Sequence, residues 1–63
     1  SNMNAYVDFS KILDNIEENE EMIEELIYWI TIFEDKSILK HKIEEKYSSI
    51  LTKEQINKII KLK

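Results

Sequence analysis

The sequence has no glycine, no proline and no cysteine, and it has a single histidine, His41. Without cysteine there is no disulfide, and one histidine cannot complete a zinc site of the usual cysteine–histidine kind. The absence of glycine excludes a glycine-rich loop of the type that cradles phosphate groups. Because cysteine-free chains are typical of reducing compartments, a cytoplasmic location is expected.

A chain of 63 residues has little capacity for a hydrophobic core. A domain of this size buries only about 60% of the surface that its unfolded form exposes. Small folds usually depend on disulfides, metals or partner chains for further stability. With disulfides excluded, we expect support from association or from a further part of a longer protein.

Long hydrophobic runs are also missing. The longest strongly apolar run, residues 26–33, is far shorter than the roughly 20 residues of a membrane helix, and no secretory leader is recognisable. No membrane partner is therefore expected. Ser1 and Asn2 before Met3 are interpreted as an expression scar, which sets residues 1–3 apart from a helical unit at residues 4–63.

The charges are divided unevenly along the chain. Residues 1–35 hold ten acids and one lysine, a net charge of −9, whereas residues 36–63 hold eight lysines and three acids, a net charge of +5. The basic half could approach phosphate groups. However, all the basic residues are lysine, and bidentate phosphate clamps usually use arginine. The charge pattern alone therefore favours ordinary solvated helix surface over a nucleic-acid site.

Hydrophobic residues recur at helical spacing, and no segment has the alternation of a strand. Four helices are predicted, at residues 4–13, 17–33, 36–48 and after Thr52, so the fold class is all-α, a small helical bundle. Thr52 and Gln55 have the spacing of a capping box, and Asp35 or Ser37 can cap the third helix. The residues predicted to face or flank the core are Tyr6, Phe9, Ile12, Leu13, Met22, Leu26, Trp29, Ile30, Phe33, Leu39, Ile43, Tyr47, Ile50, Leu51, Ile56, Ile59 and Ile60.

The second predicted helix is apolar around its whole circumference over residues 26–33, with only Thr31 as a polar gap. A helix of that kind is buried on all sides. Three short neighbours cannot easily surround it, so an exposed apolar patch or a dimer is expected. The last predicted helix reaches Lys63 without a capping signal, which indicates a piece of a longer helical protein.

No constellation for catalysis is found. Glu20, Glu21, Glu24 and Glu25 share one side of a predicted helix, but the di-iron pattern also needs a glutamate three residues before a histidine, which His41 lacks. The serines have no histidine–aspartate partners. A solvated acidic face and an exposed His41 are the favoured interpretations, with no catalytic or metal site.

The residues alone suggest two nucleic-acid interpretations. Tyr28, Trp29 and Phe33 could form a base-stacking platform, but they lie in the acidic half among isoleucine and leucine, so core packing is favoured. The last two helices could form a helix-turn-helix. Their turn lacks the usual glycine, and Lys58 and Lys61 are accompanied by few base-reading side chains.

The run "DNIEENEEMIEELIYWITIFED", followed by "KSILKHKIEEKY" and "SSILTKEQINKIIKLK", resembles a stretch of the recognition lobe of the type II CRISPR RNA-guided DNA endonuclease. The upstream "YVDFSKIL" is similar to the helix that precedes it in that family. The resemblance covers residues 6–63 and is most specific in "ENEEMIEE" leading into "FED". The chain departs from the family in a shorter connection at residues 14–16, an extra residue near 44–46 and a sparser terminal basic run.

The resemblance implies an all-helical, non-catalytic lobe that holds the guide RNA–target DNA heteroduplex by its backbone in antiviral defence. The nuclease sites, with their expected need for Mg, would lie elsewhere in the parent, so no cofactor is expected here. Lys61 and Lys63, with Lys58 beside them, are the residues carried over as backbone contacts. The remaining helical lobe would surround residues 26–33, and the isolated chain is expected to self-associate.

Two other functions stay open on the sequence. The chain could be a small helical interaction module, such as an antidote or an adaptor, that binds a protein through its apolar helix. It could also be a small DNA-binding repressor. The length of the native reading frame would separate these from the recognition-lobe interpretation.

Overall fold

The computed structural model describes residues 5–63, in which all regular structure is helical. The predicted all-α class is therefore confirmed. The interpretation of residues 1–3 as a scar, and the predicted helix start at Asn4, lie outside the described residues. The elements are α1 (Ala5–Ser10), a 3-10 turn η2 (Glu17–Asn19), α2 (Glu20–Ile32), α3 (Lys36–Tyr47) and α4 (Lys53–Ile60).

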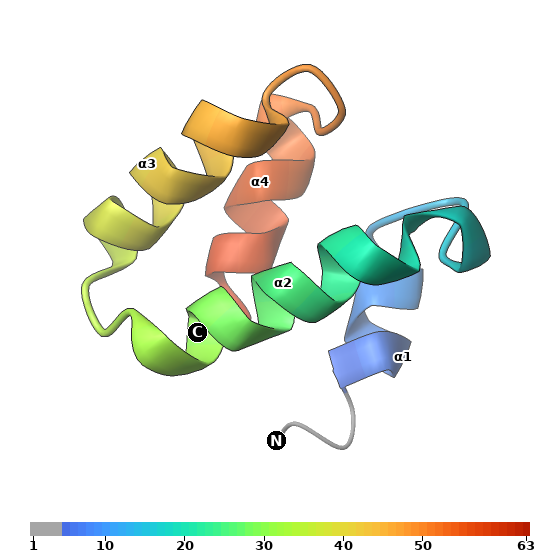
Figure 1. Cartoon of the computed structure of the whole chain (residues 1–63), viewed down its shortest axis with the longest axis horizontal. Coiled ribbons are helices and arrows are strands. Elements are labelled where there is room, and N and C mark those ends of the chain that lie inside the picture. The colour runs from blue at the N-terminus through green and yellow to red at the C-terminus, as the bar shows by residue number, and fades with distance from the viewer. Residues whose placement is uncertain (1–4) are drawn as a thin grey trace.

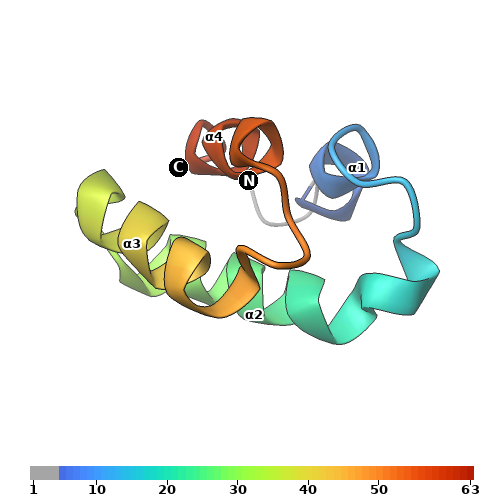
Figure 2. The same ribbon diagram turned by 90° about the horizontal axis from the view of Figure 1, so that it is seen from above.

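The helices form two layers. Seen from above, α1 and α4 lie in one layer, and α2 and α3 lie in the other (Figure 2). The α3 and α4 helices run in opposite directions beside each other, and in this view α2 lies below α3 and runs across the lower end of α4 (Figure 1). The overall extents of 27 × 27 × 18 Å describe a flat disc, as expected for two layers of short helices.

Two predicted caps fix where α3 and α4 begin. The Asp35 carboxylate accepts hydrogen bonds from the backbone N–H of Ser37 at 2.8 Å and of Ile38 at 3.3 Å. Thr52 Oγ1 accepts from the N–H of Gln55 at 3.0 Å, and the Gln55 side chain accepts from the N–H of Thr52 at 2.9 Å. Both bonds of a capping box are thus present, and Asp35 rather than Ser37 caps α3.

The core lies between the two layers and is entirely apolar within the described residues. The predicted inner faces of α3 and α4 are confirmed, because Leu39, Ile43 and Tyr47 are buried together with Ile56 and Ile59. The side chains that are almost completely buried are Phe9, Ile23, Leu26, Leu39, Ile43, Ile56 and Ile59.

The approximate bounds predicted for the helices differ from the structure by one to three residues at their carboxyl ends. The first helix ends at Ser10 instead of residue 13, because tight backbone bonds follow, from Ile12 N–H to the Phe9 carbonyl at 3.0 Å and from Lys11 N–H to the Asp8 carbonyl at 3.1 Å. The predicted helix 17–33 is divided into η2 and α2 and ends at Ile32. The third helix ends at Tyr47, one residue before the predicted bound. The fourth ends at Ile60 and not at Lys63, because the N–H groups of Leu62 and Lys63 bond to carbonyls three residues earlier.

Four predictions of burial also need correction. Tyr6 and Ile50 were expected at the core but are exposed, and Tyr6 instead donates a hydrogen bond to Glu24 at 3.4 Å. Tyr28 was expected in the core and is 60% exposed. Ile32 is 47% exposed, so α2 is not buried all round, whereas Trp29 is 6% exposed. The expected exposed apolar patch is therefore present on α2.

No helix within residues 5–63 has the length and apolar character needed to cross a membrane.

Candidate nucleic-acid interface

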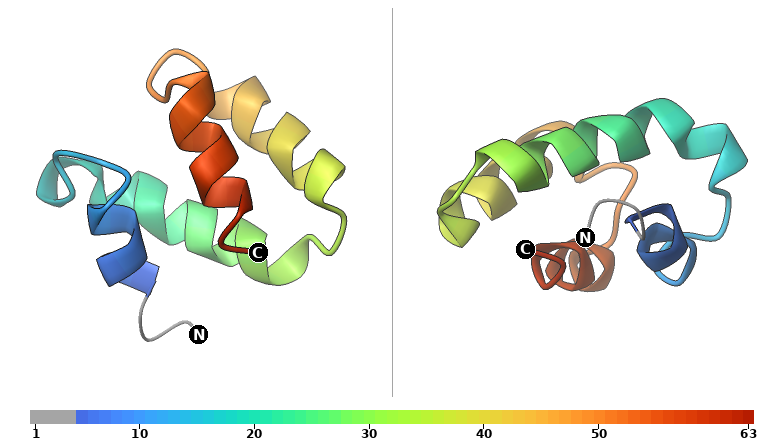
Figure 3. Two further views of the ribbon diagram at one scale, coloured as in Figure 1. Left: turned by 180° about the vertical axis from the view of Figure 1, so that it is seen from behind. Right: turned by 90° about the horizontal axis from the view of Figure 1, so that it is seen from below.

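The three lysines carried over from the resemblance lie at the end of α4. Burial of Ile56 and Ile59 fixes the rotation of this helix, so Lys58 and Lys61 project to solvent. Lys63 is also exposed and follows the last turn of α4 (Figure 3, left). Lys58 and Lys61 are one turn apart, and therefore present neighbouring positive charges on the outside of the disc.

The lysines differ in what their ammonium groups contact. The Nζ atom of Lys58 lies 3.4 Å from a carboxylate oxygen of Glu54, one turn earlier, in an exposed ion pair. Lys63 donates a hydrogen bond to the backbone carbonyl of Ile30 at 2.7 Å. Within residues 5–63, no ion pair or side-chain hydrogen bond involves Lys61. Lys61 is thus the most available of the three for a phosphate.

A second basic cluster, on α3, was missed by the sequence reasoning. Lys46 Nζ lies 2.7 Å from a carboxylate oxygen of Glu25, and the Tyr47 hydroxyl donates to the same oxygen. The Nζ atoms of Lys42 and Lys46 lie 5.9 and 5.8 Å from the ring centroid of Trp29. We call these five residues the α2–α3 joint. Its contacting residues are 13 to 22 positions apart in sequence, so no local pattern predicts it.

The joint is also an electrostatic unit. The hydrogen bond from Lys46, followed by that from Tyr47, holds the pKa of Glu25 below its usual value. The hydrogen bond to Glu25 raises the pKa of Lys46, and burial raises the pKa of Tyr47. The positive charge of Lys46 is therefore matched inside the chain, unlike that of Lys61.

The predicted acidic face is confirmed in part. Glu20, Glu21 and Glu24 are exposed, whereas Glu25 is half-buried in the joint. His41 is exposed, as expected.

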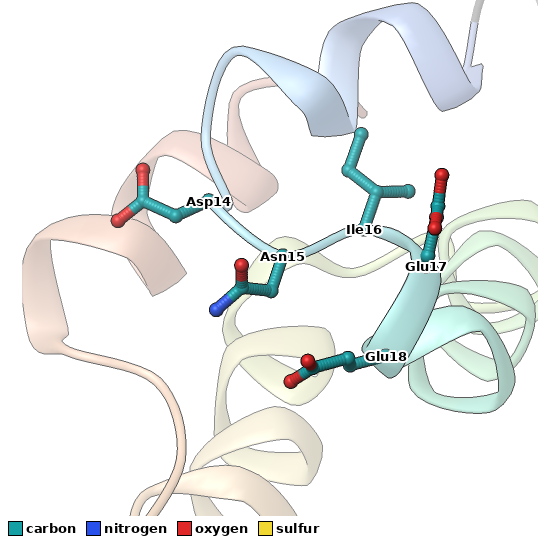
Figure 4. A pocket seen from close by; sticks show the side chains of 5 residues that line it. All are labelled: Asp14, Asn15, Ile16, Glu17 and Glu18. Carbon is teal, nitrogen blue, oxygen red and sulfur yellow. The ribbon is translucent and has the colours of Figure 1, made fainter.

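The acidic loop between α1 and α2 forms a shallow hollow, lined by residues 14–18. Its carboxylates, from Asp14, Glu17 and Glu18, spread around the loop and do not converge on one point (Figure 4). Across residues 5–63 no three or more histidine, cysteine or acidic residues are grouped so that they could hold a metal ion. The exposed end of α4 offers two neighbouring lysines, Lys58 and Lys61, that can contact an anion.

Comparison with known proteins places this geometry in context. The family described as the REC lobe of CRISPR-associated endonuclease Cas9 matches residues 1–63. The CRISPR-associated endonuclease Cas9 of Streptococcus mutans serotype c (strain ATCC 700610 / UA159) is 37% identical over 59 residues. That match covers 87% of this chain, which spans 4% of the relative's length. No solved structure matches the chain.

Proposed function

The chain belongs to the family of the REC lobe of CRISPR-associated endonuclease Cas9, and from this premise we propose that it helps to hold a guide RNA–target DNA heteroduplex. In this proposal the chain contacts the sugar–phosphate backbone, and base pairing between guide and target reads the sequence. The observation that carries the proposal is the outward projection of Lys58 and Lys61 from a helix whose inner face is locked in the core.

The proposed role is non-catalytic and concerns residues 4–63 as one recognition-lobe unit. In a parent endonuclease that carries this segment, the cleavage of DNA and its expected Mg requirement would belong to other residues. The lobe segment would supply positive charge at a fixed position. Because residues 1–35 have a net charge of −9, we place this contact in the basic half of the chain, at the end of α4.

Binding of a heteroduplex at several salt concentrations tests the proposal. A fluorescently labelled RNA–DNA heteroduplex of about 20 base pairs would be titrated with the 63-residue chain at low ionic strength. The K58M/K61M double variant is expected to weaken binding and to reduce the slope of log K against log[salt] by about two. The matched control is K36M/K40M, which removes two exposed lysines from α3. Equal slopes for K58M/K61M and the unmodified chain would refute the assignment.

We also propose a partner for the exposed apolar face of α2. Tyr28 and Ile32 are one turn apart on the side that carries Glu21 and Glu24, so they form a single stripe, which we call the α2 outer face. In a longer protein the remaining helical lobe would cover this face. In the isolated 63-residue chain the same face would be covered by a second copy.

A further inference from the structure

Lys63 is linked to a distant part of the fold. Its Nζ atom donates a hydrogen bond of 2.7 Å to the carbonyl oxygen of Ile30, which is 33 residues earlier in the sequence. Ile30 belongs to the last turn of α2. The contact therefore joins the end of α4, in one layer, to the carboxyl end of α2, in the other (Figures 1 and 2).

The carboxyl end of α2 needs a positive charge that α2 itself does not supply. The last carbonyl groups of a helix have no following helical N–H, and together they act as a partial negative charge. The last turn of α2 has no basic residue. The carbonyl of Trp29 still accepts from the N–H of Phe33 at 2.9 Å, and Glu34 and Asp35, which follow α2, add negative charge. Ile30 is the next carbonyl along, and Lys63 reaches it.

The backbone beside Lys63 explains why it turns inward while Lys61 does not. Leu62, between the two lysines, is partly buried and packs against the core. Its N–H donates to the carbonyl of Ile59 at 3.0 Å, and the N–H of Lys63 donates to the carbonyl of Ile60 at 3.1 Å. The chain thus continues past α4 in a tight turn that carries Lys63 to the end of α2.

We propose that Lys63 is a positioning residue, whose ammonium group caps the carboxyl end of α2 and so fixes the end of α4. On this assignment Lys63 does not contact phosphate, which is left to Lys61 and Lys58. The assignment of phosphate contact to Lys61 and Lys58 rests on the proposed function. The capping role of Lys63 rests on the geometry of α2 and α4. This assignment gives two different roles to three lysines that are all exposed.

The test compares K63M with K61M, which removes the same charge two residues away. Thermal unfolding of the 63-residue chain is expected to shift down by about 2–6 °C in K63M, because a favourable charge at a helix end is lost. K61M is expected to shift by less than about 2 °C, as for an ordinary surface substitution. The K63R variant keeps the cation and is expected to restore most of the loss.

Two further measurements separate capping from general destabilisation. The carbonyl ¹³C resonance of Ile30 is expected to move in K63M and to stay unchanged in K61M, because Lys63 donates to that oxygen and Lys61 does not. In titrations with an RNA–DNA heteroduplex of about 20 base pairs, K61M is expected to lower the salt slope by about one, and K63M to leave it unchanged.

The outcomes are distinguishable. An unshifted Ile30 resonance in K63M, or a salt slope that falls by about one in K63M with unchanged thermal stability, would overturn the positioning role. If K63M shows the expected resonance and stability changes while no lysine variant alters heteroduplex binding, the capping contact is supported and the proposed function fails.

Discussion

Lys46 of α3 and Glu25 of α2 are joined by an ion pair with 2.7 Å between the ammonium nitrogen and a carboxylate oxygen. The hydroxyl of Tyr47 donates to the same oxygen, and the Trp29 ring lies 5.8 Å from the Tyr47 ring at an interplanar angle of 47°. Three kinds of contact therefore meet at one place, and together they fix α3 on α2.

The first prediction concerns acid stability. Because the folded-state pKa of Glu25 is depressed, its contribution is fully present above the ordinary value of 4.5 and is lost as the pH falls through the lower folded value. The E25Q variant is therefore expected to be less stable than the unmodified chain near neutral pH, with the difference shrinking in acid. Circular dichroism melts between about pH 2 and pH 7 measure this. The E21Q variant, on the exposed side of α2, is the control. The prediction is contradicted if the stability of E25Q and that of the unmodified chain fall equally as the pH is lowered.

The contribution of Lys46 to stability depends on pH in the opposite direction. The pKa of Lys46 is raised, so its contribution is present below the ordinary value of 10.5 and is lost as the pH rises through the higher folded value. K46M is expected to destabilise the chain at neutral pH and to lose that difference only in strong alkali. Fluorescence of Trp29, which the Lys46 ammonium approaches, reports the same transition. A difference between K46M and the unmodified chain that disappears near neutral pH would show that the pair is not formed.

The capping box of α4 gives the third prediction. T52A removes the hydroxyl that accepts from the N–H of Gln55, so a loss of about 1 kcal/mol is expected, or about 4–8 °C in the melting temperature. T31A is the matched control. Thr31 is exposed within α2 and its hydroxyl only bonds back to the Ile27 carbonyl at 2.9 Å, so T31A is expected to change stability little or to increase it. Equal melting temperatures for T52A and the unmodified chain would argue against a working cap.

The fourth prediction uses two isoleucines that differ in burial. Ile59 is fully buried between α4 and the core, whereas Ile50 is 57% exposed in the turn before α4. I59V is expected to cost about 0.5–1.5 kcal/mol by leaving a small cavity, and I50V close to nothing. Chemical denaturation of both variants measures the difference in the free energy of unfolding. A larger loss in I50V than in I59V would mean that Ile50, and not Ile59, is the buried residue.

Self-association is the subject of the fifth prediction. The Y28S/I32S double variant removes the α2 outer face and is expected to weaken association of the isolated chain without unfolding it, because both side chains are exposed. The I38S/I50S variant, which removes two exposed isoleucines elsewhere, is the control. Sedimentation of the unmodified chain should show a mass that rises with concentration. A monomer at all concentrations would exclude this role for the α2 outer face.

The sequence was sufficient for features that depend on nearby residues. The Thr52–Gln55 box and the inner face of α3 were both predicted correctly, because a cap and a helical stripe are set by spacings of three and four. Local spacing does not determine where the buried face of a helix ends, because this depends on which other helices pack against it. Ile23 was omitted from the predicted core and is fully buried, whereas Tyr28 was included and is exposed.

The candidate site also has features that the sequence predicts and contacts that it does not. The exposure of Lys58 and Lys61 follows from the helical period of α4. The contact of Lys63 with Ile30, and of Lys46 with Glu25, joins residues 33 and 21 positions apart along the chain. Such contacts depend on how α2 crosses the other helices, which no local pattern contains.

The short connection between α3 and α4, residues 48–52, has a consequence for the order of folding. Closing so short a loop costs little chain entropy, and helices that pair with their immediate neighbours form in microseconds to milliseconds. Residues 33–35, between α2 and α3, form an even shorter connection, so α2, α3 and α4 should assemble first and α1 should dock late. Folding φ-values are accordingly expected to be higher at Ile43 than at Phe9. The basic edge of the disc would then exist before α1 has packed against the other helices.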